Sequence, residues 1–186
     1  MGFVSFGKGD SKAVDTIRGL LDRSLTNIEL PEGLTSIGGS AFYGCSRLAD
    51  IKIPDSVTSI KGSAFFKCTS LSDIIIPCRV TNIESYICYY CSRLADIKIL
   101  GRITSIGNSA FQGCAKLNTI VLTNTTTIAN LTDVSAFINT PIANGTGYIY
   151  VPAALIDDYK VATNWVTYAD QFRSIEDFPE VLEVSE

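Results

Sequence analysis

The sequence predicts a solenoid of stacked repeats, and three observations support this prediction. A segment of 23 residues recurs at a fixed spacing, and periods between about twenty and fifty residues are typical of solenoids. Each copy opens with Leu-x-x-Ile-x-Ile, whose alternation indicates a strand with one buried face. Each copy then repeats the same apolar positions, so stacking places like residues above like. The copies begin at Leu25, Leu48, Leu71, Leu94 and Leu117.

Each repeat continues from its strand into a turn and a second apolar stretch. In the second copy Ile51 and Ile53 alternate with Lys52, and Pro54 ends the strand because proline cannot donate to a β ladder. A Ser-Ala-Phe block and a cysteine follow, which predicts a phenylalanine column and a cysteine column in the core. These columns contain Phe42, Phe65 and Phe111, and Cys45, Cys68, Cys91 and Cys114.

Repeat phase and composition divide the chain into four parts. Residues 1–24 are predicted to form an N-terminal helical cap, because apolar residues after Ser11 recur at helical spacing. Residues 25–122 hold four full repeats and the start of a fifth. Residues 123–175 are predicted to hold an irregular repeat and a C-terminal cap of one strand and short helices. Residues 176–186 form an acidic tail, which we expect to be frayed or to act as a linker.

The repeat phase slips after Leu117. A Ser-Ala-Phe block at 135–137 looks like the usual block delayed by an insertion. A last strand is expected at 148–151, followed by short helices near 153–162 and 165–172. Their large apolar side chains are available to cover the open end of the stack.

Composition limits the classes of function that fit the chain. Its 186 residues are 46% hydrophobic, which suits one domain with a sizeable core. The net charge of −4 argues against a nucleic-acid-binding surface, which would need a basic stripe. The sequence has no apolar run of about eighteen residues, so no membrane span is predicted. The first residues lack the basic start and apolar core of a signal peptide, which leaves the compartment open.

The residues that commonly carry catalysis or bind metals are scarce. The sequence contains no histidine, which removes the usual triads and the commonest general base and metal ligand. Cys88 and Cys91 form a Cys-x-x-Cys pair, but no second pair completes a zinc site, and Cys88 stands where other repeats place phenylalanine. We therefore expect core thiols there, a surface thiol at Cys78, and no catalytic residue, cofactor or metal.

The outward positions of the predicted strands are candidates for a binding surface. Asp50, Asp73 and Asp96 form one column, and Lys52, Ile75 and Lys98 form the next. Val121 extends the second column, and with Ile75 it is expected to add exposed apolar surface. Two interpretations stay open: a solvated sheet face of mixed charge, or a shallow binding face.

An aromatic column follows the phenylalanine column by one position. It contains Tyr43, Phe66 and Tyr89 and ends at Gln112. Repeat three departs most from the others, reading Ser-Tyr-Ile-Cys-Tyr-Tyr over residues 85–90. Exposed amphipathic rings favour recognition, but such rings can equally form a second packed layer.

The repeat Leu-x-x-Ile-x-Ile-Pro-x-x-Val-Thr-Ser-Ile-Gly-x-x-Ala-Phe-x-x-Cys resembles the BspA-like leucine-rich repeat. The resemblance covers Leu25–Lys116, and the segment from Ile149 through Trp165 is similar to the end of such arrays. Ile87 and Cys88 depart from the motif, and so does Leu100, which replaces the proline. The resemblance implies a leucine-rich repeat right-handed solenoid with its β-sheet on the concave side. The motif defines packing, so no site residue is carried over.

The resemblance also implies a class of function. Such proteins occur in host-associated bacteria and some protists, are commonly displayed on the cell surface or secreted, and bind other proteins or cells. We therefore expect a non-catalytic protein-binding or adhesion module whose partner is a host-matrix or cell-surface protein. An alternative is a structural subunit that works by self-association. An enzyme would instead show a deep pocket with perturbed carboxylates.

Overall fold

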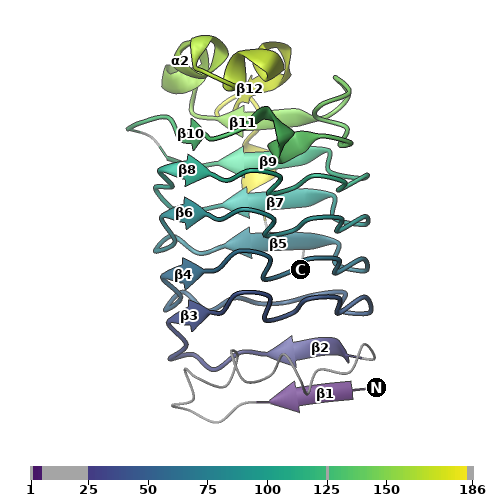
Figure 1. Ribbon diagram of the computed structural model, residues 1–186. Helices are drawn as coiled ribbons and strands as arrows, with labels where there is room; N and C mark the ends of the chain where they lie inside the picture. The colour runs from purple at the N-terminus through teal and green to yellow at the C-terminus, as the bar shows by residue number, and fades with distance from the viewer. Residues whose placement is uncertain (1, 6–24, 125, 184–186) are drawn as a thin grey trace.

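Stacked coils form a ladder in the computed structural model, with one coil for each 23-residue repeat (Figure 1). The structure describes residues 2–5, 25–124 and 126–183. The N-terminal strands lie at one end of the stack and the C-terminal helical turns lie at the other (Figure 1). The repeat solenoid predicted from the 23-residue period is therefore confirmed.

The long strands at the start of successive repeats form one parallel sheet. Its order is β12-β11-β9-β7-β5. The pairing register follows the repeat, because Asp73 pairs with Asp96 and Ile97 pairs with Ile120, each 23 residues apart. The strands are β5 Asp73–Ile76, β7 Asp96–Ile99, β9 Thr119–Leu122, β11 Tyr148–Val151 and β12 Phe172–Ser174.

The N-terminal end of the stack starts with a strand. β1 (Gly2–Ser5) pairs in parallel with β2 (Leu25–Glu29), which differs from the helical cap expected over residues 1–24. The helical spacing after Ser11 lies outside the described residues. Repeat two has no strand at its opening leucine. A bridge between Glu29 and Lys52, and a hydrogen bond from the Ala49 N–H to the Thr26 carbonyl, link β2 to the stack.

A second row of two-residue parallel strands lies on another side of each coil and was not predicted. It forms at the apolar stretch that follows the turn in each repeat. Its sheets have the orders β3-β4 and β10-β8-β6. The strands are β3 Ser36–Ile37, β4 Ser59–Ile60, β6 Asn82–Ile83, β8 Ser105–Ile106 and β10 Asn130–Leu131.

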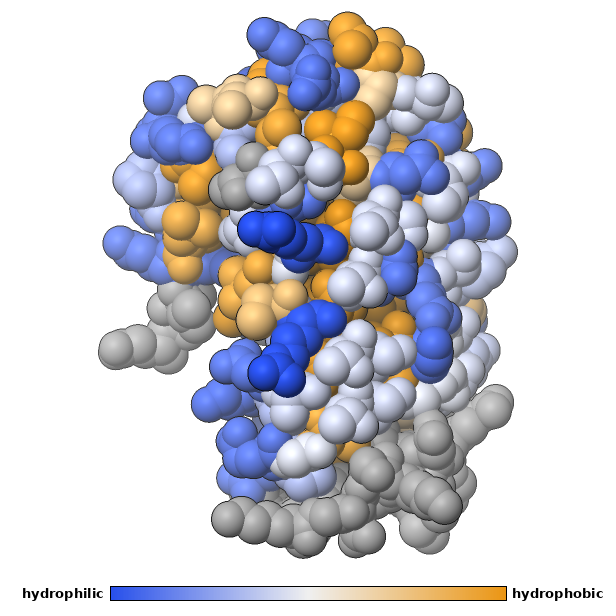
Figure 2. Space-filling view, turned by 90° about the vertical axis from the view of Figure 1, so that its left-hand side faces the viewer, coloured by the Kyte–Doolittle hydropathy of each residue, from blue (hydrophilic) through white to orange (hydrophobic). Residues whose placement is uncertain are grey.

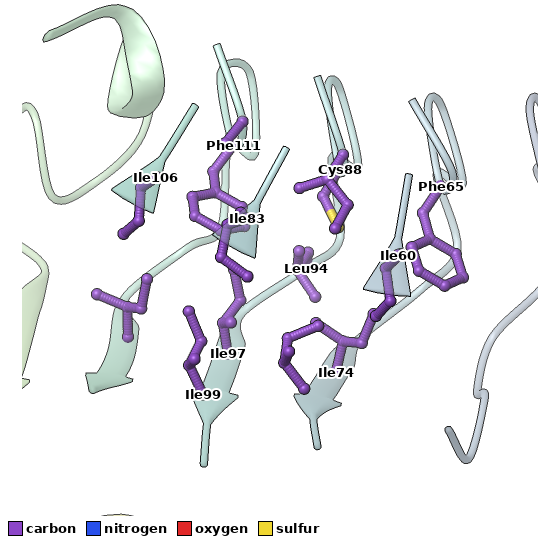
Figure 3. Packing of buried hydrophobic residues seen from close by; sticks show 14 of the residues in the cluster. Ile60, Phe65, Ile74, Ile83, Cys88, Leu94, Ile97, Ile99, Ile106 and Phe111 are labelled. Atoms are coloured by element: carbon purple, nitrogen blue, oxygen red, sulfur yellow. The ribbon is translucent and has the colours of Figure 1, made fainter. Parts of the chain in front are cut away.

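The core lies between the two rows of strands and the Ser-Ala-Phe turns (Figure 3). Isoleucines from both rows point toward one another across it, and the phenylalanine column closes its third side (Figure 3). Phe42 stacks on Phe65 with ring centroids 5.3 Å apart. Cys88 takes the phenylalanine position in repeat three, as expected (Figure 3).

The delayed Ser-Ala-Phe block returns to phase in the structure. It lies in η1 (Val134–Phe137), and Phe137 stacks on Phe111 at 5.7 Å although the two are 26 residues apart (137−111). The backbone N–H of Phe111 donates to the carbonyl of Ala136, as the equivalent N–H of Phe42 donates to Ala64. The inserted residues therefore lie in the segment before η1, and the buried positions of this coil keep the register of the other repeats.

Helical turns cover the last coil. After β11 the chain forms η2 (Ala153–Leu155), α2 (Ile156–Val161) and η3 (Trp165–Gln171), and then enters β12. Trp165 is fully buried, and its indole N–H donates to the carbonyl of Ala129 at 2.7 Å. The Tyr159 hydroxyl accepts from the N–H of Ala129 at 3.0 Å. These bonds fix the helical turns to the irregular repeat.

A final short helical turn, η4 (Pro179–Leu182), follows β12 and runs back past β9 and β7, where it appears in yellow (Figure 1). The handedness of the solenoid and the concave placement of its sheet stay predictions. Among the described residues, no helix is long and apolar enough to cross a membrane.

Candidate interaction surfaces

The predicted site residues fall on two separate surfaces. One is the aromatic patch, which consists of the predicted column Tyr43, Phe66 and Tyr89 together with Tyr86 and Tyr90. The other is the sheet face, which consists of the outward side chains of the long strands, beginning with Asp50, Lys52, Asp73, Ile75, Asp96 and Lys98. A different shallow depression lies at each surface. One is beside Tyr43, and the other is between β5 and the C-terminal segment, which is Phe178–Glu183.

Ring stacking follows the repeat spacing in the aromatic patch. Tyr43 and Phe66 have ring centroids 4.6 Å apart, and Phe66 and Tyr89 have centroids 4.8 Å apart. These distances match the spacing of neighbouring strands, because each ring projects from the same position of consecutive coils. The Tyr43 side chain is 50% exposed, while Phe66 and Tyr89 are half-buried. The rings thus pack on one another and still present their edges to solvent.

Repeat three widens this patch with two more rings. Tyr86 meets Tyr89 edge-on at 5.5 Å, and Tyr90 meets Tyr89 at 4.7 Å. Tyr86 and Tyr90 are 38% and 42% exposed. A Lys67 ammonium lies 5.6 Å from the Phe66 centroid, within cation–π range. Five linked rings and one cation therefore occupy a continuous surface.

Tyr86 and Tyr90 both adopt a left-handed backbone, with φ of 60° and 57°. Such a backbone costs an ordinary residue about 1–2 kcal/mol. The position of Tyr86 carries serine in the other repeats, and the position of Tyr90 carries glycine in two of them. The equivalents are Ser40, Ser63 and Ser109, and Gly44, Lys67 and Gly113. The sequence shows the substitutions, but the strain becomes visible only with the backbone.

Gly113 supports the Tyr90 ring from the next coil. A Cβ placed on Gly113 would lie 2.9 Å from two atoms of that ring, closer than such contacts occur. Gly113 also has a φ of +77°, which glycine adopts without penalty. Both the ring position and the turn therefore depend on this glycine.

The sheet face carries mixed charge in the predicted columns. Asp73 pairs with Asp96, and Ile75 pairs with Lys98, in adjacent strands. Aspartates that are directly opposite repel each other, and Lys98 lines the same depression as both of them. Asp50 and Lys52 continue the columns toward the N-terminal end and are exposed. Figure 2 shows an adjoining side of the stack, on which apolar colour gathers toward the C-terminal end.

The C-terminal segment, Phe178–Glu183, covers part of this face, which differs from a frayed end, one of the two expectations for the acidic tail. Phe178 meets Tyr150 of β11 edge-on at 5.8 Å. The Lys98 ammonium donates to the backbone carbonyl of Glu183. Val181 lines the depression that Ile75 and Lys98 also line.

The prediction that Val121 adds exposed apolar surface is wrong, because the residue is fully buried. Its neighbours in the sheet are Lys98 on one side and Tyr150 on the other. Both neighbours contact the C-terminal segment, so this level of the face is shielded. Ile75, two strands away, stays half-buried.

The thiols behave as core groups. Cys78 is exposed, whereas the other five cysteines are buried and no disulfide forms among the six. Burial raises the pKa of the Cys45 and Cys114 thiols to about 12, so they remain protonated and unreactive at neutral pH. The Cys91 thiol donates to the carbonyl of Phe65, and Cys68 and Cys114 make equivalent bonds. Among the described residues, no cluster of His, Cys, Asp and Glu has a metal-binding arrangement.

Comparison with known proteins identifies the repeat. A family model described as BspA type leucine rich repeat region matches six copies over residues 21–142. The chain belongs to the BspA-type leucine-rich repeat family. A solved structure, described as the crystal structure of T. pallidum leucine rich repeat protein (TpLRR), is similar at 36% identity and a TM-score of 0.51. The alignment covers 53% of this chain and 46% of that protein, so the chain spans about half of its length. No curated protein matches the chain.

The BspA-type match includes the aromatic patch and most of the sheet face, but it ends before the C-terminal segment. Leucine-rich repeat domains generally mediate protein–protein interaction. Members of the family are typically associated with the cell surface.

Proposed function

We propose that this chain is a non-catalytic module that binds a protein partner through the aromatic patch. The observation that carries the proposal is the pair of half-exposed tyrosines at left-handed positions, Tyr86 and Tyr90. The equivalent positions of the sibling repeats are left-handed as well, so what distinguishes repeat three is that exposed rings replace serine, glycine and lysine there. Tyrosine also dominates the energetics of protein interfaces because it buries a large ring and keeps a polar tip.

The shape of the surface favours a protein partner over a small substrate. The depressions beside Tyr43 and near Tyr86 are shallow and open to solvent, unlike a deep substrate pocket. The absence of histidine and the burial of five of the six thiols also favour binding over catalysis. These features support a non-enzymatic role.

Family membership supports the finer parts of the proposal. BspA-type repeat proteins are typically surface-associated, which fits an adhesion role and a surface or secreted location. An exposed aromatic patch is suited to binding another protein, and a host-matrix or cell-surface protein is the class of partner that we propose. The source in a host-associated bacterium rests on the same resemblance.

A capture experiment with matched variants tests the proposal. Tyr86→Ser/Tyr90→Gly gives repeat three the residue types of its siblings and removes two rings without disturbing the core. We expect wild-type protein to retain a discrete partner from host-matrix and cell-surface extracts, and the double variant to lose it. Lys52→Glu/Lys98→Glu changes the sheet face alone and should retain the partner.

The opposite pattern would contradict the assignment of the site. Retention by the tyrosine variant and loss by the lysine variant would place binding on the sheet face. A stable oligomer in light scattering, with nothing captured, would favour the alternative of a structural subunit that self-associates. Turnover of any offered substrate would contradict the non-catalytic role.

A further inference from the structure

The C-terminal segment, defined as Phe178–Glu183, is directed onto the sheet face by a local turn. Glu176 accepts hydrogen bonds from the backbone N–H of Ala153 and from the Ser174 hydroxyl, both at 2.9 Å. The N–H of Phe178 then donates to the carbonyl of Ile175 at 3.1 Å. This turn ends the sheet at β12 and reverses the chain so that it crosses the strands it has just left.

The segment contacts two strands of the sheet face and lines a depression together with a third. Its Phe178 ring lies on Tyr150 of β11, and the Glu183 carbonyl accepts from Lys98 of β7. Between them Val181 lies over the depression lined by Ile75 of β5. An aromatic anchor, an aliphatic anchor and a backbone carbonyl therefore meet a complementary ring, aliphatic residue and cation.

The aromatic end of this contact is reinforced on the sheet side. The Arg173 guanidinium lies 4.4 Å from the Tyr148 ring centroid, and the Tyr148 and Tyr150 rings are 6.4 Å apart. Burial raises the pKa of Tyr150, with the nearby Glu180 carboxylate contributing in the same direction. A ring pair and a cation are therefore in place before the Phe178 ring is added.

The hold on the segment is nevertheless loose. Phe178 is 38% exposed and Val181 is half-buried, so the anchors are only partly desolvated. The depression also places Glu180 and Glu183 near Asp73 and Asp96, where like charges oppose the contact. Because the contact has complementary shape but repulsive charges, a competing ligand can displace the segment.

We propose that the sheet face between β5 and β11 is a peptide-binding site that the chain's own C-terminal segment occupies as a displaceable latch. The ligand class is a short peptide segment with one aromatic and one aliphatic anchor three residues apart, the spacing of Phe178 and Val181. The inference does not rest on the aromatic patch, since the two surfaces share no residue.

Tethering sets how strongly the latch competes. A segment joined through a short linker acts at an effective concentration of about 1 mM. A free peptide of the same sequence therefore binds the latched chain more weakly than a chain without the latch. We expect a difference of about tenfold, because the segment is held by few contacts.

The experiment removes residues 178–186 and adds the segment back as a peptide. The deletion keeps Glu176 and its hydrogen bonds to Ala153 and Ser174, so the end of the sheet stays capped. The probe is a synthetic peptide of residues 176–183 with blocked ends, titrated to about 5 mM and followed by NMR shifts. Saturable binding to the truncated chain, about tenfold tighter than to the full chain, is the expected result.

The chain offers a matched pair of control variants. Lys98→Glu in the truncated chain should weaken peptide binding at least about fivefold, because it removes the contacting cation. Lys52→Glu changes the same column two levels away, where the segment makes no contact, and should leave the affinity unchanged. Tyr86→Ser/Tyr90→Gly should also leave it unchanged, which separates this site from the aromatic patch.

Three results would overturn the proposal. The first is that the truncated and full chains bind the peptide with equal affinity, and the second is that a scrambled peptide binds as well as the native one. The third is that peptide binding does not saturate although the truncated chain is folded and unfolds at the same midpoint as wild type. If the truncated chain does not fold, Phe178→Ala/Val181→Ser in the full chain replaces it. That variant should bind the peptide more tightly than wild type, and an unchanged affinity would contradict the proposal that the segment is a latch.

Discussion

Repeat two (residues 48–70) and repeat three (residues 71–93) occupy adjacent levels of the stack and differ in opposite ways inside and outside. Inside, Ala64 and Phe65 become Ile87 and Cys88, so a small–large pair is replaced by a large–small pair and the site stays fully buried. Outside, serine and lysine at the two left-handed positions both become tyrosine. The core compensates for substitution, whereas the surface changes its chemistry.

Binding specificity in a repeat protein is therefore expected at the outer positions of the repeats and not in the core. Interior columns must match the coils above and below, so they tolerate only volume-conserving changes. Outer positions are free of that constraint, so a substitution there can change the chemistry of the surface without changing the core. Tyr86 and Tyr90 are substitutions of this second kind.

The largest expected effect comes from breaking the phenylalanine column in repeat two. Phe65→Ala should lower the free energy of unfolding by about 3–5 kcal/mol, because it leaves a cavity under Phe42. Cys88→Ala at the equivalent position of repeat three should cost much less, about 1 kcal/mol, since only one buried atom is removed. Urea unfolding measures both, and equal losses would show that the two repeats do not pack as described.

Alkaline pH should weaken the shared cysteine column. Burial holds the pKa of Cys114 at about 12, above the ordinary value of 9.0. Between pH 9 and pH 12 the unfolded thiol ionises and the folded one does not, so stability falls as pH rises. The expected loss is about 1.4 kcal/mol per pH unit for this thiol.

Urea unfolding at pH 8.5, 9.5 and 10.5 checks this slope. At pH 8, Ellman's reagent should modify Cys78 rapidly and leave the five buried thiols unreacted. Cys78→Ser should then abolish the fast phase and keep the pH slope. A flat profile, or several fast thiols, would contradict the buried column.

Two equivalent glycines separate backbone strain from ring support. Gly44→Ala meets nothing within 4 Å and should cost only the left-handed penalty, about 1–2 kcal/mol. Gly113→Ala carries the same penalty and also displaces the Tyr90 ring. We expect an additional loss of about 1 kcal/mol, from the ring contacts. Equal losses in thermal unfolding would mean that Tyr90 does not rest on Gly113.

The smallest effect is expected from Tyr86→Ser/Tyr90→Gly. Tyr90→Gly relieves one left-handed backbone, whereas serine keeps the penalty at position 86. This relief offsets part of the lost ring contacts, so the free energy of unfolding should change by less than about 1 kcal/mol. Differential scanning calorimetry against wild type gives this value directly. A loss of several kcal/mol would assign the tyrosines to packing and remove the argument for a binding role.

Much of the fold follows from the sequence because period and burial are the same signal in a solenoid. The strand at Tyr148–Val151 and the in-phase Phe137 could be located because each coil reuses the buried positions of the one before. The two-residue strands such as Ser59–Ile60 were missed, because so short a segment carries no alternation of its own. Their pairing arises only when the coils are stacked.

The candidate surfaces were less accessible to sequence reasoning. The aromatic column could be read from its spacing, but the φ values of Tyr86 and Tyr90 could not. The covering of Val121 was missed because Phe178 lies 57 residues further along (178−121) and its acidic surroundings resemble a free tail. Contacts outside the repeat period leave no periodic trace.

The most direct test of the central claim compares the affinity of a captured partner for wild type and for Tyr86→Ser/Tyr90→Gly by calorimetry, together with their unfolding midpoints. The account predicts at least about a tenfold loss of affinity with an unchanged midpoint, since exposed tyrosines at an interface commonly contribute that much. An unchanged affinity would contradict the claim that repeat three carries the binding surface.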